Sequence, residues 1–110
     1  MKFPLRMHLL KFEKNNNPFQ IKTEWIEGIK AYHIGSDNIN KYKSALVKLL
    51  EKIPKYSDVI VVAGEIDCRP DEGILVTAKK NQIDYLQLAV KTGDKFIETI
   101  IEYRKKYYLN

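Results

Sequence analysis

The chain has 110 residues, 45% of them hydrophobic and 30% charged, with a net charge of +5. This length excludes more than one domain, and no apolar run is long enough to cross a bilayer. The single cysteine excludes an intrachain disulfide and suits a reducing compartment. We therefore expect one domain spanning residues 1–110, without a membrane span and located in the cytoplasm, with residues 1–20 extended or partly ordered.

The basic residues give little reason to expect nucleic-acid binding. Most of the lysines are scattered, and the dense cluster is Arg104, Lys105 and Lys106, next to Tyr107 and Tyr108. Cations suit the C-terminal end of a helix, whereas a nucleic-acid site should show a longer basic stripe. Together with these tyrosines and Tyr103, the cluster is also a candidate protein-binding surface, since Tyr and Arg are common interface anchors.

The first 30 residues contain one predicted strand. The sequence MHLLKF, residues 7–12, has the length and composition of a strand, and EKNNNP, residues 13–18, is typical of a loop. Residues 21–29 surround Trp25 and suit either a short helix or an irregular segment. We expect Gly28 to end this segment.

A strand and then a helix are predicted next. KAYHI, residues 30–34, has the pattern of a short strand, and Ser36, Asp37 and Asn38 are all good N-caps for a helix that runs to about Ile53. Pro54 ends that helix. Its apolar residues recur every three or four positions, which predicts one buried face made of Tyr42, Ala45, Leu46, Leu49, Leu50 and Ile53.

The central stretch is DVIVVAGEIDCR, residues 58–69. Val59–Ala63 is a short, wholly apolar run rich in β-branched residues, which predicts a strand buried on both faces. Gly64 ends the run, and four polar or reactive side chains follow: Glu65, Asp67, Cys68 and Arg69. Ligands of open parallel sheets bind beyond the carboxyl ends of the strands, so this is the candidate edge of a site.

The last part of the chain is predicted to be mainly helical. Residues 74–78 are apolar but short, and suit either a helix or an extended segment. Residues 81–84 start a long helix that frays near Tyr107, and Gly93 interrupts it at a cost of about 1 kcal/mol relative to Ala. One face is expected to be buried, made of Ile83, Leu86, Val90, Ile97, Ile100 and Ile101.

This order of elements predicts the α/β class, with a small parallel sheet of two or three strands flanked by helices. The crossover between residues 34 and 58 should be right-handed. Two central strands make a poor sheet alone, so either residues 7–12 supply a third strand or a partner chain completes the sheet.

The string GEIDCR, residues 64–69, together with AYHIG, VIVVA and EGILV, resembles proteins of the SGNH (GDSL-type) hydrolase fold, in a branch that carries this signature after its third strand. The likeness covers about residues 31–108. It implies a flavodoxin-like sandwich with residues 7–12 as the first strand, between KAYHI and VIVVA. Gly35 matches the position of the family's oxyanion-hole glycine.

The catalytic motifs of that family are absent from this sequence. There is no Gly-Asp-Ser and no C-terminal Asp-x-x-His, since both histidines, His8 and His33, lie early in the chain. Ile66 stands where the family has an oxyanion-hole asparagine. Acyl transfer needs an activated nucleophile with a base within hydrogen-bonding reach. The resemblance therefore implies an SGNH-like domain or fragment that has lost this mechanism.

The strand-end residues allow a structural and a functional interpretation. In the structural one, Asp67 caps the following loop and Arg69 pairs with Glu65 or Asp67. In the functional one, Arg69 binds an anionic group bidentately and a carboxylate acts as the base. Glu65, Arg69 and Gly35 are then the substrate-binding candidates.

Cys68 with His33 and Asp67 is the candidate catalytic set. If the side chains meet, His33 would lower the thiol pKa and Asp67 would orient the imidazole, which would make a cysteine-dependent hydrolase or transferase acting on a small ester or a glycan-type substrate. The alternative is that Cys68 is a small buried hydrophobic residue and His33 a hydrogen-bonded strand residue.

Other chemistry has weaker support. No spacing matches a metal site, and the single glycine at Gly35–Ser36 is no phosphate loop, so we expect no metal and no cofactor. The leading hypothesis is a non-catalytic structural or interaction module that works through self-association or a protein partner.

Overall fold

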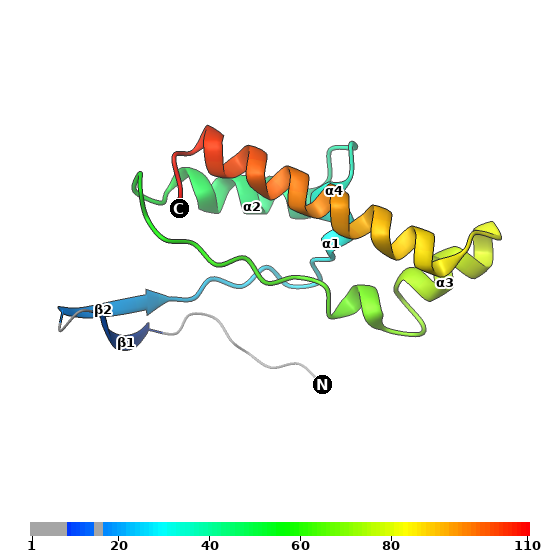
Figure 1. Cartoon of the computed structure of the whole chain (residues 1–110), viewed down its shortest axis with the longest axis horizontal. Helices are drawn as coiled ribbons and strands as arrows, with labels where there is room; N and C mark the ends of the chain where they lie inside the picture. The colour runs from blue at the N-terminus through cyan, green and yellow to red at the C-terminus, as the bar shows by residue number, and fades with distance from the viewer. Residues whose placement is uncertain (1–8, 15–16) are drawn as a thin grey trace.

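The computed structural model describes residues 9–14 and 17–110, and it describes the side chains of residues 21–110. A two-stranded hairpin is followed by helices and one 3-10 turn (Figure 1). The elements are β1 (Leu9–Lys14), β2 (Asn17–Lys22), α1 (Ala31–Gly35), α2 (Lys41–Glu51), the 3-10 turn η1 (Ile66–Cys68), α3 (Ile74–Asn81) and α4 (Tyr85–Lys106).

The hairpin contains the predicted N-terminal strand. β1 runs antiparallel to β2, with Leu10 opposite Ile21 and Phe12 opposite Phe19. Residues 7 and 8 of the predicted strand lie outside the described residues. β1 continues to Lys14, so the predicted loop at 13–18 is wrong at both of its ends. For residues 21–29 the prediction left a short helix or an irregular segment open. β2 ends at Lys22, and the rest is irregular, with Gly28 at a φ of 79°.

The predicted parallel sheet is not formed, and the α/β prediction is wrong. The described residues contain one sheet, in which β1 and β2 pair only with each other, and helices make up most of the remainder (Figure 1). The sequence KAYHI is helical, as α1. Val59–Ala63 lies in a segment without a strand partner among the described residues. An apolar, β-branched run cannot form a sheet without a neighbouring strand to take up its backbone hydrogen bonds.

α1 forms because its first amide groups find side-chain acceptors. The Lys30 backbone N–H donates to Nδ1 of His33 at 3.0 Å, and the next two amides donate to the Asp67 carboxylate, which comes from 36 residues further along the chain. A five-residue helix has little stability of its own. A long-range contact has therefore decided the local structure of KAYHI against its strand-like composition.

α2 is a predicted helix with a different cap. Asn40, and not Ser36, Asp37 or Asn38, is the N-cap, and its side chain accepts from the Lys43 amide at 2.8 Å. The helix ends at Glu51, before Pro54. Leu46 and Leu50 of the predicted face are buried, which confirms the orientation of that face.

The core lies where α1, α2, α4 and the C-terminal tail meet. Ile34 is fully buried, and it clusters with Leu46, Leu50, Tyr103 and Leu109. The tail after α4 folds back onto residues 56–59, where the Asn110 amide donates to the Ser57 carbonyl at 2.9 Å and the Asn110 carbonyl accepts from the Val59 amide at 3.2 Å. This pairing holds the start of the segment 58–64 against the helices.

The two C-terminal helices settle an alternative and confirm a boundary. Residues 74–78 are helical, as the first part of α3, and Gln82 ends α3 with a left-handed φ of 55°. Asp84 is the N-cap of α4 and accepts from the Leu86 amide at 3.1 Å, which confirms the predicted start.

The predicted buried face of α4 is wrong except at Ile100, which packs against the core. The helix turns Thr92, Phe96, Thr99 and Tyr103 toward the rest of the molecule. Four apolar residues expected inside are instead exposed, by 46–64%: Leu86, Val90, Ile97 and Ile101, called here the α4 stripe. Threonine suits the inner face because each hydroxyl donates to a carbonyl of its own helix, from Thr92 to Leu88 at 2.7 Å and from Thr99 to Lys95 at 2.9 Å.

Candidate functional site

The side chain of Asp67 joins two distant parts of the chain. Its Oδ2 accepts from the Ala31 amide at 2.7 Å and its Oδ1 accepts from the Tyr32 amide at 3.2 Å, while the residue is only 5% exposed. The first turn of α1 has no acidic residue of its own. A negative charge at this position satisfies otherwise unpaired amides and suits the helix dipole. Asp67 thus caps α1 and not the loop that follows it, which corrects the structural interpretation made from the sequence.

Further contacts join the same parts of the chain around Asp67. The Lys30 ammonium donates to the Glu72 carbonyl at 2.7 Å. Gly73, the N-cap of α3, lies so close to Asp67 that a Cβ there would overlap the Asp67 carbonyl group. We call Lys30–Tyr32 with Asp67 and Gly73 the Asp67 corner. It is a close-packed joint between α1, η1 and α3, and no side chain larger than hydrogen fits at position 73.

His33 lies on α1 and takes part in the same joint. Its Nδ1 accepts from the Lys30 amide, and its ring stacks on Tyr42 with the ring centroids 4.1 Å apart. Burial lowers the pKa of His33, as do the charges of Lys30 and Lys41, while the charge of Asp67 acts in the opposite direction. An imidazole that accepts at Nδ1 carries its proton on Nε2, so the neutral tautomer suits this position.

We expect the protein to lose stability on mild acidification because of His33. Its pKa in the folded state lies below the ordinary value of 6.5, so below about pH 6.5 the unfolded chain binds the proton more readily than the folded one. The free energy of unfolding should therefore fall from about pH 6.5 down to the folded-state pKa. Urea unfolding at several pH values checks this.

The variant His33→Gln should remove most of that pH dependence, and His8→Gln, which changes the other histidine of the chain, should leave it. A separate loss is expected below about pH 4, since the hydrogen bond from Lys95 lowers the pKa of Asp37 from its ordinary 3.8. A flat wild-type profile between pH 7 and 5 would contradict the assignment to His33.

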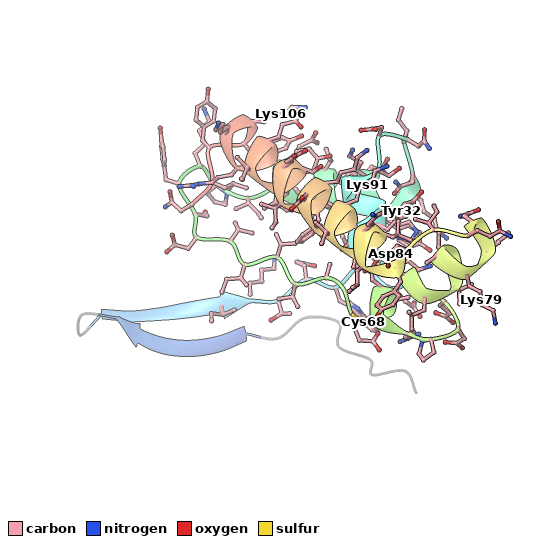
Figure 2. The ribbon with its side chains drawn as sticks, turned by 45° about the vertical axis from the view of Figure 1, so that its right-hand side comes forward. Tyr32, Cys68, Lys79, Asp84, Lys91 and Lys106 are labelled. Atoms are coloured by element: carbon pink, nitrogen blue, oxygen red, sulfur yellow. The ribbon has the colours of Figure 1, made fainter. Side chains whose placement is uncertain are left out.

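Cys68, the candidate nucleophile, lies at the surface. It is the last residue of η1 and an exposed free thiol, on the turn beneath the N-terminal half of α4 in Figure 2. Within residues 21–110 no hydrogen bond joins Cys68 to His33. The structure places Asp67 and His33 in the joint at α1, with both Asp67 oxygens and the His33 Nδ1 engaged by backbone amides.

Arg69 and Glu65 form an exposed ion pair. The Arg69 guanidinium contacts Glu65 through two nitrogens, Nε at 3.0 Å and Nη2 at 2.9 Å, and Glu72 through Nη1 at 3.3 Å. These contacts, with the hydrogen bond to Glu65 the largest, raise the pKa of Arg69. The pairing of Arg69 with Glu65 is confirmed, and its carboxylate partners occupy the fork that would bind an anion.

Gly35 is buried between helices. A Cβ on Gly35 would lie 2.8 Å from the backbone of Lys95 and Phe96 in α4. The glycine therefore allows α1 and α4 to approach each other. The atoms nearest to this Cβ position belong to α4 and not to the exposed pair of Arg69 and Glu65.

The surface hollows lie elsewhere. A shallow one runs along α4 over Leu86, Val90 and Lys91, and another lies between the loop 37–40 and α2. None of the candidate residues His33, Asp67 or Cys68 lines them. In the part of the chain that the structure describes, no group of three His, Cys, Asp or Glu side chains is arranged to hold a metal ion.

Comparison with known proteins gives this chain no family name. No known protein family, curated protein or solved structure matches the chain.

Among the described residues, no helix has the length and apolar character needed to cross a membrane.

Sequence reasoning missed the apolar surface. Val59 and Ala63 pack against the core, but Ile60 and Val62 between them are 83% and 86% exposed. The signal was present in the sequence, since these residues belong to the run that was predicted to be a strand buried on both faces. What the sequence could not show is that the described part of the chain covers only one of those faces.

Proposed function

We propose that this protein is a non-catalytic interaction module that docks on another protein chain through the apolar surface it leaves open. The exposed outer face of the segment 58–64 carries the proposal. Monomeric soluble proteins rarely expose contiguous apolar patches larger than a few hundred Å², and larger exposed patches mark interaction sites. The resemblance to SGNH proteins stays a prediction, and the proposal does not depend on it.

The segment 58–64 has the features of a docking edge. Its inner residues Val59 and Ala63 pack on the core, which fixes its position, while Ile60 and Val62 project outward. In the described part of the chain, no backbone hydrogen bond from residues 60–63 to another element is found. An extended segment with free backbone groups and alternate outward side chains is what strand addition by a partner requires.

The chemistry of the candidate catalytic residues also favours this function. The Asp67 carboxylate, the His33 imidazole and the Arg69 guanidinium each have structural partners. A hydrolase needs such groups directed at substrate. We also place the module in the cytoplasm, where its exposed Cys68 thiol stays reduced.

Charge on the outer face of the segment tests the function. The variant Ile60→Asp/Val62→Asp should keep the helical circular dichroism of the wild type, because both side chains are mostly exposed. A free docking surface binds a hydrophobic dye such as ANS, and a covered one gives a mass above that of one chain. We expect the wild type either to bind the dye or to have a mass above that of one chain. The double variant should reduce whichever of these two effects the wild type shows. Ile39→Asp is the matched control, since Ile39 is 94% exposed in another loop.

A folded wild-type monomer that binds no dye and behaves as the double variant does would contradict the proposed function. Turnover of a short acyl ester, lost in Cys68→Ala, would replace it with the hydrolase alternative.

A further inference from the structure

The α4 stripe is a long exposed apolar feature among the described residues. Leu86, Val90, Ile97 and Ile101 follow one another at three- and four-residue spacing, with Gly93 between Val90 and Ile97. That spacing keeps them on one side of the helix. All four are 46–64% exposed, and Ile83, just before the helix, is 45% exposed. From Leu86 to Ile101 the stripe covers 15 helical steps, or about 22 Å along the helix axis.

Gly93 lies in the middle of this stripe, and no contact within the described part of its own chain requires a glycine there. Glycine inside a helix is less favourable than alanine. A Cβ at Gly93 would meet no other atom within 4 Å, in contrast to Gly35, where α4 itself is in the way. The absence of a side chain at Gly93 would allow the backbone of another helix to come close.

We propose that a second copy of this chain covers the α4 stripe, with the two α4 helices antiparallel and crossing at Gly93. This inference goes beyond the proposed function, because it concerns a second apolar surface, apart from the outer face of the segment 58–64. A two-fold axis beside Gly93 places Leu86 of one copy opposite Ile101 of the other, and Val90 opposite Ile97. The same patch is then used by both copies, as an isologous dimer requires.

The charges along α4 are complementary to an antiparallel copy. α4 begins at the carboxylate of Asp84 and ends with three cations, Arg104, Lys105 and Lys106. Figure 2 shows Asp84, Lys91 and Lys106 spaced along the helix from its first turn to its last. With the axis beside Gly93, Arg104 of one copy lies almost opposite Asp84 of the other. The two helix dipoles are also antiparallel in this arrangement, so the positive end of each helix lies beside the negative end of the other.

The charged residues beside the α4 stripe are also complementary to an antiparallel copy. Lys91 of one copy would lie level with the stretch between Asp94 and Glu98 of the other. No salt bridge joins these three residues to neighbours within residues 21–110 of their own chain. A parallel pair would place Lys91 beside Lys91, and Arg104 beside Arg104, so like charges would repel along its length.

Cross-linking of single cysteines tests the arrangement. In a Cys68→Ser background, Leu86→Cys is made in a tagged chain and Ile101→Cys in an untagged one, and each is treated with a short bismaleimide alone and after mixing. We expect the mixed product of one tagged and one untagged chain to dominate. Each variant alone should give little product, because identical positions lie about 22 Å apart along the axis in an antiparallel pair.

Four results would overturn the proposal. Efficient cross-linking of Leu86→Cys with itself would mean a parallel pair. No cross-link from a chain that nevertheless assembles would mean another interface, and the proposed function would survive. Binding to vesicles of anionic lipid without any cross-link would mean that the stripe meets a membrane surface. A chain that neither assembles nor binds dye would remove the proposed function as well.

Gly93→Ala provides a second measurement. A methyl group at a close helix crossing is expected to reduce association about tenfold. Because the site is open in the single chain, the same change should raise the melting temperature of the dilute monomer. An unchanged association constant would contradict the crossing at Gly93, even if dimers form.

Discussion

Asp67→Ala should be among the most destabilising single substitutions in this chain, at about 2–4 kcal/mol. The carboxylate accepts from the amides of Ala31 and Tyr32 while nearly fully buried, so its removal leaves two donors of α1 without an acceptor. Small domains are stable by only about 5–15 kcal/mol, which makes this a large fraction of the total. Urea unfolding followed by circular dichroism measures the change.

Two further variants separate the role of the cap from general damage. Asp67→Asn keeps one carbonyl oxygen and should lose less stability than Asp67→Ala. Asp71→Ala removes an exposed carboxylate four residues away and should change stability by less than about 0.5 kcal/mol. If Asp67→Ala unfolds at the same urea concentration as Asp71→Ala, the Asp67 corner does not hold α1 in place.

Gly35→Ala is the second substitution with a large expected effect, about 3 kcal/mol of lost stability. Its Cβ would come within 2.8 Å of the α4 backbone at Lys95 and Phe96, and backbone cannot rotate away as a side chain can. α1 and α4 would have to separate, and the contacts of Ile34, the one large side chain that is fully buried among residues 21–110, would loosen. Thermal melts of the dilute chain measure the loss.

The matched control is Gly93→Ala in the same melts, below the concentration at which chains associate. The chemical change is identical, but nothing lies within 4 Å of the new methyl group, so the melting temperature should rise. Equal effects of the two substitutions would contradict the close approach of α1 to α4.

Local signals in the sequence predicted the elements whose stability is mainly local. Asp84 starts α4 and Pro54 follows the end of α2, because capping and the missing proline amide act within one turn. The buried positions Leu46 and Leu50 of α2 also follow from spacing alone. These predictions needed no knowledge of what packs on the helix.

The failures have a common physical cause. KAYHI is strand-like in composition, but Asp67 supplies acceptors for the first amides of a helix, and no local pattern shows a partner 36 residues away. VIVVA was predicted to be buried on both faces, whereas Ile60 and Val62 face outward. In α4 the spacing predicts that the apolar stripe is the inner face. The inner face instead contains buried threonines whose hydroxyls donate to carbonyls of their own helix.

The candidate site was predictable only in part. The pairing of Arg69 with Glu65 follows from their four-residue spacing, and it is present. The joint made by Asp67, His33 and Gly73 was not predictable as a structural unit, since its parts come from distant segments. The roles of Cys68 and the other candidates in any reaction stay predictions, and the enzyme assays described above test them.

The mass of the wild-type chain in solution, measured by sedimentation equilibrium over a range of concentrations, tests the central claim most directly. One chain has a mass of 12.9 kDa. We expect twice this value at high concentration and a return to the mass of one chain on dilution. Ile97→Asp should shift this transition to higher concentration. Ile39→Asp should leave the transition unchanged. A folded chain that stays at 12.9 kDa throughout, with a single cooperative melt, would contradict the claim that the α4 stripe is covered by a second copy.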